Sequence, residues 1–511
     1  MKKLVTFALV LSAGQAFASG PVAPLVLVDE HDPSDTFDRV TVGSTEYVVN
    51  NTTRFAAAPT SQRWVATFSF KNPASAVEDQ ILVVGNGRSV TPVVVESLTP
   101  YTAGASFLLG VEFPSINDDG AWAIATVPVD LTPDDNSTPA PEALLQRVLV
   151  ATPDGLGGFT YSTAVKAGDV LAGVGVFDDP EGAMIRNDGS VAFTDSNFDS
   201  EFVGPTDAFF TSPTALALEE AGAAPSGQFP PSDFRPVSSV GEFIVSPGTG
   251  DWIIDGTLET GGVFSGPPYN GSATADVIVV NGVVIGQEGQ TFSEAGGFAA
   301  PGPGDPLVTD FDDPTINASG QYAFIMDLDG VNHAVVYDGS GFTVVAAEGG
   351  PVLPGSTELW TGLQDVYLAD DGTYVVTGNT DGDGLTNNVA VANNRFVIAR
   401  EGDALDFDGD GTPDGYLDGD LNADETIFGD GSAFVIRTDI KDAFDGSTMT
   451  PNDSFFMVAT HPADWDIDGT VNVNDLLGFL GAFRNGAGDF DRNGATNVND
   501  LLGFLGAFRQ M

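Results

Sequence analysis

The chain has 511 residues, of which 18 are basic and 72 acidic, and its net charge is −54 with no cysteine. The missing cysteines exclude disulfides and thiolate metal sites, and the negative charge argues against nucleic acid and anionic membrane surfaces as partners. No stretch after the N-terminal segment is long and apolar enough to span a membrane.

The first twenty residues, MKKLVTFALVLSAGQAFASG, have the pattern of a secretory signal peptide. Lys2 and Lys3 precede an apolar run, and Ala16-Phe17-Ala18 has the small residues of a cleavage site. The apolar run is too short for a membrane anchor. We therefore expect residues 1–18 to be removed, the mature chain to begin near Ser19, and the protein to be secreted, either extracellular or at the cell surface.

The body, residues 19–460, consists of short Val, Ile, Phe and Tyr runs separated by turn residues, which predicts an all-β fold. A phrase recurs in it: an apolar residue, Asn or Asp positions, Gly, and then Ala with a large apolar residue. Its copies are INDDGAWAI (116–124), IRNDGSVAF (185–193), INASGQYAF (316–324), LADDGTYVV (368–376), IFGDGSAFV (427–435) and two weaker ones, APTSQRWVA (58–66) and SPGTGDWII (246–254). Seven copies predict about seven repeat units.

Each phrase is expected to be a tight hairpin, because Asn and Asp bond their own backbone and Gly supplies a positive φ. Between phrases lie pairs of apolar strands around a turn, as in segments 276–289, 334–350 and 389–403. Four strands in each of seven units predict a β-propeller. An open solenoid and two β-sandwiches are the alternatives.

One feature favours a closed ring. The last unit lacks its final strand, and the segment PLVLVDEHD (24–32) resembles the strands that end other units. An N-terminal strand completing the last blade would remove the exposed sheet edges of an open array.

The body resembles a class of secreted bacterial repeat proteins that carry a tandem NxxGxxAF motif followed by a variable C-terminal anchor. The resemblance covers roughly residues 40 to 460, with departures at Gln62 and Pro247. It implies no particular activity.

Two loops of the sixth unit have alternating acidic or amide residues, the spacing of calcium-binding loops. In DFDGDGTPD the expected ligands are Asp406, Asp408, Asp410 and Asp414. In NTDGDGLTN they are Asn379, Asp381, Asp383 and Asn387. Ordinary acidic turns are the alternative for both.

The tail, residues 461–511, contains two near-identical copies of a twelve-residue calcium loop, each followed by LLGFLGAF. Glycine at position 6 permits the sharp turn that lets alternate oxygen ligands converge on calcium. In the first loop the ligands at positions 1, 3, 5, 7, 9 and 12 are Asp464, Asp466, Asp468, Thr470 through its carbonyl, Asn472 and Asp475. In the second they are Asp489, Asp491, Asn493, Ala495 through its carbonyl, Asn497 and Asp500.

Each LLGFLGAF segment predicts a helix with one wide apolar face, and the two faces are expected to pack in pseudo-twofold fashion. The first face comprises Leu476, Leu477, Phe479, Leu480 and Phe483. So small a core is marginal, and the clustered carboxylates repel one another without Ca²⁺. Metal binding and folding of the tail are therefore expected to be coupled.

The paired loops and helices of residues 464–511 resemble the dockerin family, whose calcium loop–helix modules bind cohesin domains. Aspartate at position 12 fits that family, and the resemblance implies Ca²⁺ as the cofactor and a cohesin-like or other surface protein as the partner. One departure concerns the partner. Loop positions 10 and 11, often Ser-Thr in dockerins, are Val473-Asn474 and Val498-Asn499 here.

Nothing in the sequence singles out a catalytic residue. The three histidines, His31, His333 and His461, lie in different parts of the chain, and no GxSxG or HExxH motif is present. We therefore expect a non-enzymatic binding or structural protein assembled through its calcium-dependent tail. The alternative is a carbohydrate-active enzyme that a dockerin delivers to polysaccharide. A central pocket with two convergent carboxylates and stacked aromatics would favour that alternative, whereas a channel lined by small and apolar residues would favour the non-enzymatic interpretation.

Overall fold

The computed structural model describes residues 22–23, 39–42, 45–58, 61–71, 78–86, 89–95, 100–102, 105–108, 114–130, 145–201, 204–220, 222, 225–227, 237–259, 274–405, 415–418, 421, 426–438, 440–441, 454–465, 470–486, 488–490 and 496–509. Within these ranges, neither helix has the length and apolar character needed to cross a membrane.

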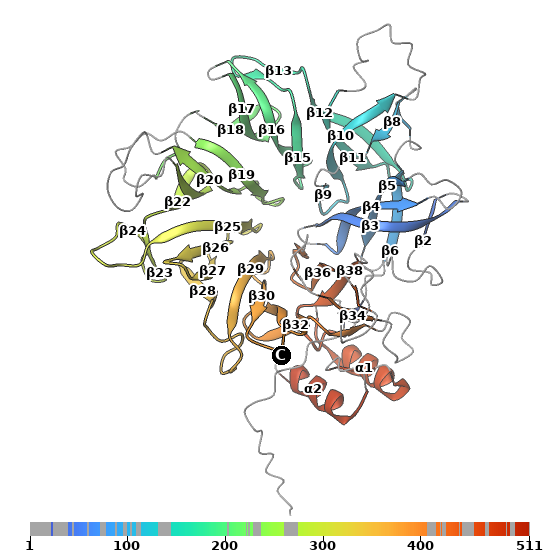
Figure 1. Ribbon diagram of the computed structural model, residues 1–511. Helices are drawn as coiled ribbons and strands as arrows, with labels where there is room; N and C mark the ends of the chain where they lie inside the picture. The colour runs from blue at the N-terminus through green and yellow to red at the C-terminus, as the bar shows by residue number, and fades with distance from the viewer. Residues whose placement is uncertain are drawn as a thin grey trace, which may run out of the picture.

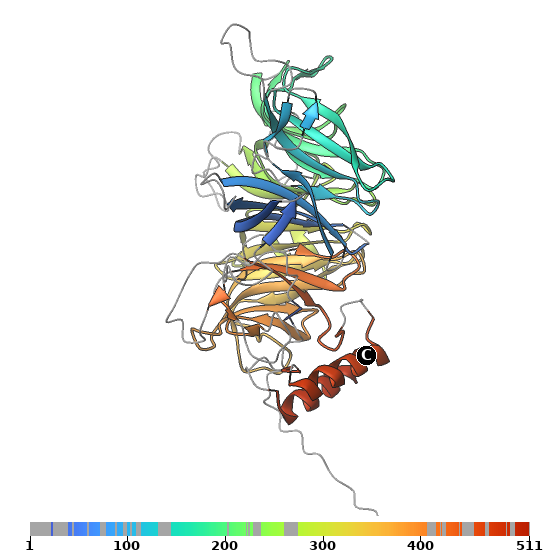
Figure 2. The same ribbon diagram turned by 90° about the vertical axis from the view of Figure 1, so that its right-hand side faces the viewer.

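Seven antiparallel sheets stand around a central axis, so the body is a seven-bladed β-propeller (Figure 1). Within blades 4, 5 and 6 the chain runs from the axis outward, and consecutive strands pair as neighbours. The predicted propeller is therefore confirmed against the open solenoid and the pair of sandwiches. Figure 2 shows the blades from the side.

The strands follow in chain order. Blade 1 has β2 (Arg39–Val42), β3 (Thr45–Ala57), β4 (Arg63–Lys71), β5 (Glu78–Asn86) and β6 (Ser89–Val95); blade 2 has β7 (Pro100–Thr102), β8 (Ala105–Leu108), β9 (Ser115–Ile116), β10 (Trp122–Asp130), β11 (Arg147–Pro153) and β12 (Phe159–Lys166); blade 3 has β13 (Val170–Leu171), β14 (Gly175–Val176), β15 (Pro180–Ile185), β16 (Val191–Ser200), β17 (Gly204–Ser212) and β18 (Ala215–Glu219). Blade 4 has β19 (Val237–Val245), β20 (Trp252–Glu259), β21 (Thr274–Val280) and β22 (Val283–Gln287); blade 5 has β25 (Val308–Ile316), β26 (Tyr322–Leu328), β27 (Asn332–Tyr337) and β28 (Phe342–Ala347); blade 6 has β29 (Trp360–Leu368), β30 (Tyr374–Thr380), β31 (Asn388–Ala392) and β32 (Phe396–Arg400). Blade 7 has β35 (Thr426–Ile427), β36 (Ala433–Thr438), β38 (Ser454–Ala459) and β1 (Val22–Ala23); small accessory sheets are formed by β23 (Thr291–Ser293) with β24 (Gly297–Ala299), and by β33 (Ala404–Leu405), β34 (Gly415–Leu417) and β37 (Ile440–Lys441).

The N-terminal strand closes the ring. β1 is the outer strand of blade 7 and pairs antiparallel with β38, Val22 opposite Val458 and Ala23 opposite Met457. The two ends of the propeller are thereby joined in one sheet, which removes two free sheet edges. The predicted closing segment, 24–32, lies outside the described residues, and the strand that closes the ring immediately precedes it.

The recurring phrases form the turns that join the innermost strand of each blade to the strand beside it, as between β3 and β4 or between β25 and β26. The phrase glycines take φ values between 71° and 89°, as predicted, at Gly120, Gly189, Gly250, Gly320, Gly372 and Gly431. In the turn after β25, the Asn317 side chain accepts hydrogen bonds from the backbone N–H groups of Ser319 and Gln321, both at 3.0 Å. Its own amide donates to the Ala369 carbonyl of the next blade at 2.9 Å.

Successive turns are bonded to one another around the axis. Each described bond joins adjacent blades: Arg63 Nη1 to Asp118 O (2.5 Å), Asn117 Nδ2 to Arg186 O (2.9 Å), Asn187 N to Pro247 O (2.9 Å), Asn317 Nδ2 to Ala369 O (2.9 Å), Asp370 N to Gly429 O (2.8 Å) and Gly429 N to Ala58 O (3.3 Å). Between blades 4 and 5 the turns touch by packing, since a Cβ on Gly248 would lie 2.8 Å from the Ala318 Cβ. We call these seven turns the turn ring.

The hydrophobic core lies between the blades. Among the described residues it consists of clusters that each combine two neighbouring blades; one, for example, joins Val336 of blade 5 to Val376 of blade 6. The largest fully buried side chains include Trp64, Trp122 and Trp360. Blade-to-blade packing and the turn ring thus act on the same interfaces.

The tail forms two helices, α1 (Val473–Asn485) and α2 (Val498–Phe508), outside the ring and beside blades 6 and 7 (Figures 1 and 2). Phe479 of α1 stacks on Phe504 of α2 with ring centroids 4.1 Å apart and an interplanar angle of 2°. The equivalent residues of the two repeats therefore meet at a pseudo-twofold axis, as the sequence predicts.

Replacing Asn317 with Ala tests the turn ring. The change leaves two backbone N–H groups and the Ala369 carbonyl without their partner, so we expect a loss of about 2–4 kcal/mol in the free energy of unfolding. Chemical denaturation of the full chain measures it. The control is Ser319→Ala in the same turn, where the side chain is exposed and a change within about 0.5 kcal/mol is expected; equal effects would contradict the role given to Asn317.

Candidate functional site

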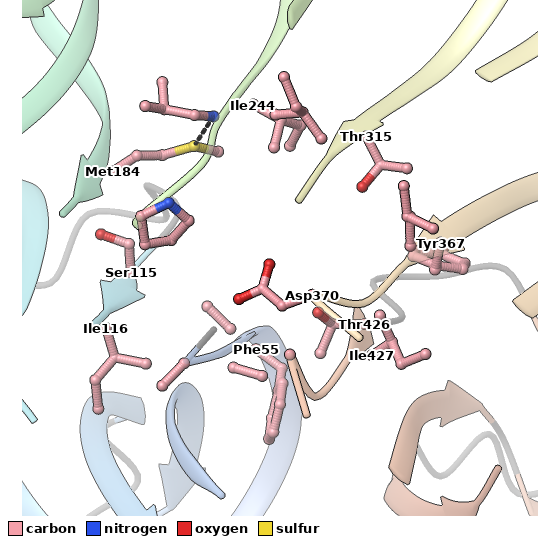
Figure 3. A pocket seen from close by; sticks show the side chains of 18 of the residues that line it. Phe55, Ser115, Ile116, Met184, Ile244, Thr315, Tyr367, Asp370, Thr426 and Ile427 are labelled. Atoms are coloured by element: carbon pink, nitrogen blue, oxygen red, sulfur yellow. Dashed lines mark hydrogen bonds between the residues drawn. The ribbon is translucent and has the colours of Figure 1, made fainter. Parts of the chain in front are cut away.

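A cavity of about 440 Å³ lies on the propeller axis (Figure 3). Its size is that of a small-molecule site. The lining comes from the inner strands and the turn ring: Phe55, Ala56, Ala57, Ala58, Pro114, Ser115, Ile116, Ala183, Met184, Ile185, Ile244, Val245, Pro247, Asp313, Thr315, Ile316, Asp365, Val366, Tyr367, Leu368, Asp370, Thr426, Ile427 and Gly429. Most of the wall is apolar, and the only charged side chains in this lining are three aspartates.

Bulges in the inner strands aim two of these aspartates. The pairing register of β25 with β26 shifts between Asp312 and Thr315, and that of β29 with β30 shifts between Leu363 and Val366. A bulge re-aims side chains that regular pleating would hold in alternation. Asp313, with a left-handed φ of 50°, and Asp365 occupy the two bulges at equivalent positions of neighbouring blades.

The two bulge aspartates form a carboxyl pair. Burial raises the pKa of Asp365 above its ordinary value, whereas hydrogen bonds with the side chains of Asp313, Thr377 and Tyr367 act in the opposite direction. Among these partners, Thr377 places its Oγ1 3.4 Å from an Asp365 oxygen. Both aspartates line the cavity from neighbouring blades, and burial disfavours the charged form of Asp365.

Asp370 lies at the turn-ring end and points toward the axis (Figure 3). One of its oxygens accepts from the Ala318 N–H, and the other is buried and without a partner in the described structure. Burial raises the pKa of Asp370 to about 6, with like charges at Asp118 and Asp371 adding to the shift.

The structure describes only part of the predicted calcium loops of the tail. Asp464, Thr470, Asn472 and Asp475 of the first loop and Asp489, Asn497 and Asp500 of the second are described, whereas Asp466, Asp468, Asp491, Asn493 and Ala495 lie outside the described residues. Within the described part of the chain no three acidic, histidine or cysteine side chains form a group that could hold a metal. Metal binding by these loops therefore stays a prediction.

The last ligand of each loop has a definite structural position. Asp475 is fully buried and accepts from the N–H groups of Trp465 (2.8 Å) and Asn472 (2.7 Å). Asp500 repeats this with Phe490 (2.8 Å) and Asn497 (2.6 Å). Each carboxylate thus ties the start and end of its loop to the first turn of its helix.

The predicted apolar face of the helices is divided between interior and surface. Phe479 and Phe504 are buried, but Leu477 and Leu502 are each 62% exposed. The expectation that the whole face packs inward is wrong, because Trp465 and Phe490 at loop position 2 fill the core instead: Trp465 contacts Phe479 and Phe490 contacts Phe504. The apolar pattern of LLGFLGAF alone does not show how much of the helix face is covered. The aromatic residue at position 2 of each loop is the sequence feature that shows it.

The other candidate residues belong to the two acidic loops of the sixth unit and to the three histidines. In the loop 379–387, Asp381 accepts from the Leu359 N–H and Asp383 from the Leu385 N–H, as in an ordinary acidic turn. Asp406, Asp408, Asp410 and Asp414 lie outside the described residues. His333 lies in β27 and His461 after β38, in different blades, while His31 is not among the described residues.

The cavity aspartates were missed by the sequence analysis. Two of the three stand three residues before the last apolar residue of their inner strand, Asp313 before Ile316 and Asp365 before Leu368. Aligning the units on their phrases reveals this equivalence, but nothing in the pattern shows that the position is a bulge facing the axis.

Solved structures with a similar fold are distant. The β-propeller domain of the Trilobed protease from Pyrococcus furiosus is 8% identical with a TM-score of 0.39, over 80% of this chain and 95% of that one. An oligogalacturonate lyase in complex with manganese is 11% identical with a TM-score of 0.36, over 86% and 98%. A Trypanosoma rangeli sialidase in complex with sialic acid is 7% identical with a TM-score of 0.29, over 93% and 60%.

Similarity at the level of the amino-acid sequence is more limited. No curated protein sequence is detectably similar to this chain. Residues 164–405, which run from the end of blade 2 to β33 beyond blade 6, match the model of a family of unknown function, DUF7453.

Proposed function

We propose that this chain is a secreted, non-enzymatic binding protein that docks onto a partner protein through a calcium-dependent, dockerin-like tail. The propeller is the displayed domain in this proposal, and the paired helices are the attachment. Extracellular Ca²⁺ would hold the two loops in their docking conformation.

The observation that carries the proposal is an apolar surface that the tail repeats twice. Val473 and Leu477 of α1 are 61% and 62% exposed, and their equivalents in α2, Val498 and Leu502, are 61% and 62% exposed. Matched exposure of large apolar side chains in both repeats is typical of a surface that a partner covers.

The charge of this surface supports a protein partner. The only acidic residues in the two helices are Asp475 and Asp500, and both are fully buried. Arg484 and Arg509 are exposed at the helix ends. In a chain of net charge −54, the helices therefore present an uncharged apolar patch with flanking cations, which fits an apolar patch flanked by carboxylates on the partner.

Calcium is supported by the loops that flank the helices. Position 12 is held at the helix N-terminus in both repeats by paired backbone hydrogen bonds, and Asp464 at position 1 of the first loop is only 2% exposed. Carboxylates gathered at the two ends of a loop repel one another unless a cation lies between them.

The enzymatic alternative has one of its expected signs, since the carboxyls of Asp313, Asp365 and Asp370 line the central cavity. The rest of the lining is largely apolar, which favours a binding role. Trp252 and Trp360, which could have formed a sugar platform, are 7% and 2% exposed within the blade cores.

Calcium titration of the full chain tests the metal part of the proposal. After treatment with a chelator, we expect calorimetry to detect uptake at two tail sites that disappears in the Asp464→Asn/Asp489→Asn double variant, because each change removes a charged ligand at loop position 1. The control is Asp188→Asn/Asp338→Asn, which removes the same charge from propeller turns. Calcium uptake that the tail variant leaves unchanged would contradict a calcium-loaded tail.

Binding to a recombinant cohesin domain in the presence of Ca²⁺ tests the docking surface. We expect the Leu477→Asn/Leu502→Asn double variant to bind about 100-fold or more weakly, because two central apolar side chains are lost. The matched control is Leu156→Asn, a leucine 92% exposed at the tip of the β11–β12 hairpin. Absence of binding by the unmodified chain would exclude a cohesin as the partner.

A further inference from the structure

The central cavity is separate from the docking surface proposed for the tail. Its apolar wall and its carboxyls suggest that it has a binding role of its own. The wall is apolar along most of its length, and the polar groups are confined to separate carboxyl positions. Empty apolar cavities of this kind receive a ligand whose shape fills them, while a few polar groups fix its orientation.

The carboxyls lie at two levels along the axis. Asp365 and Asp370 stand on the same inner strand and its following turn, five residues apart. At about 3.3 Å per residue an extended strand separates them by at most about 16 Å. If two hydrogen bonds of about 2.8 Å are taken from this span, at most about 10 Å remains for the ligand itself.

The carboxyls at both levels are at least partly buried. One oxygen of Asp370 has no hydrogen-bond partner in the described structure, and burial raises the pKa of Asp365 although the Thr377 hydroxyl donates to it at 3.4 Å. No lysine, arginine or histidine is among the residues described as lining the cavity. A buried carboxylate without a nearby cation is costly, so a positively charged donor is the ligand group that relieves both levels.

The net charge of the whole molecule also favours a positively charged ligand. With a net charge of −54, the potential in a cleft with low-dielectric walls is strongly negative, which concentrates cations and excludes anions. A bare metal ion fits poorly, because the described residues provide no group of three metal-binding side chains and the walls between the carboxyls are apolar.

We propose that the central cavity binds a linear aliphatic cation with an ammonium group at each end, one at Asp370 and the other at the Asp313–Asp365 pair. The methylene chain lies against the apolar wall formed by residues such as Ile316, Val366 and Leu368. An ammonium group has three donors and no acceptor, which matches carboxyl oxygens and no basic side chain. This inference is independent of calcium and of the tail.

The proposal has a consequence for the ligand-free protein. A carboxyl whose pKa is raised by burial favours the neutral form, so its contribution to stability is present below the unfolded pKa and is lost as the pH rises toward the folded pKa of about 6. Asp118 and Asp371, the charged groups that face Asp370, are both acidic and add to this loss; the facing donor is the Ala318 N–H.

Asp370→Asn should therefore stabilise the empty protein, since the amide oxygen still accepts from Ala318. We expect the midpoint of thermal unfolding to rise relative to the unmodified chain at about pH 8, and to rise much less at about pH 5, where Asp370 is mostly protonated. A rise that is equal at both pH values, or a fall at pH 8, would contradict a carboxylate held at the expense of stability.

The binding experiment uses the full chain and titration calorimetry at fixed calcium. The probes are 1,6-diaminohexane and 1,8-diaminooctane, with hexylamine, octylamine and the corresponding diols as controls. We expect at least one diamine to bind about tenfold or more tightly than its monoamine, because the second ammonium adds charged hydrogen bonds, and the diols to bind more weakly still.

Variants locate the site. Asp370→Asn and Asp365→Asn should each reduce diamine affinity about tenfold, to the level of the monoamine, while Asp338→Asn, which removes an exposed turn carboxylate, should leave it unchanged. Circular dichroism and thermal unfolding establish that each variant is folded. Diamines that bind no better than monoamines or diols, or diamine binding that both cavity variants leave unchanged, would overturn the proposal.

Discussion

The hydrogen bonds of the turn ring are the constraint on which the rest of the molecule depends. A propeller holds together only if each blade keeps its angle to the next, and apolar packing between sheets does not fix that angle by itself. Asn317 does so because one side chain both shapes its own turn and donates to the next blade. Asn117 has the same arrangement, accepting from Asp119 and Ala121 and donating to Arg186. The phrase that repeats along the sequence is thus an interface as well as a turn.

The cavity follows from this constraint. Fixed turns hold the ends of the inner strands around the axis, and the bulges that precede them provide the local freedom needed to aim side chains inward. Register shifts occur in β3, β15 and β19 as well as in β25 and β29. In β25 and β29 the shifted segment includes an aspartate that lines the cavity, Asp313 and Asp365. Scaffold and site are therefore separated by a few residues in each unit: glycine and asparagine set the turn, and the bulge position remains free to vary.

The sequence predicts those features that depend on local chemistry. Positive φ at the phrase glycines, the strand pairs between phrases and the helices after the tail loops all follow from neighbouring residues, and each is confirmed. Ring closure is predictable because the strands of each unit can be counted in the sequence, and the last unit lacks one strand. The convergence of Asp313 and Asp365 is not predictable in this way, since it depends on a pleat irregularity and on the distance between two blades. The exposure of Leu477 and Leu502 is missed for a related reason: periodicity marks an apolar face, but the aromatics of the preceding loops decide how much of it is covered.

The acidic residues fall into groups with opposite electrostatic behaviour, and this division connects the charge of the chain to its function. In the outer turns, hydrogen bonds from Ser190 lower the pKa of Asp188, and those from Ser340 and Gly341 lower the pKa of Asp338. Such carboxylates are satisfied as anions and need no counter-ion to hold their turns. In the cavity, burial outweighs the hydrogen bonds that these side chains accept, and the pKa of Asp365 and of Asp370 rises. A chain that only needed solubility in salty water would keep its carboxylates in the first environment. Three carboxyls line a largely apolar cavity at the centre of a strongly negative molecule, and burial disfavours the charged form of Asp365 and Asp370. Perturbed carboxyls that gather in one cavity are typical of a binding site.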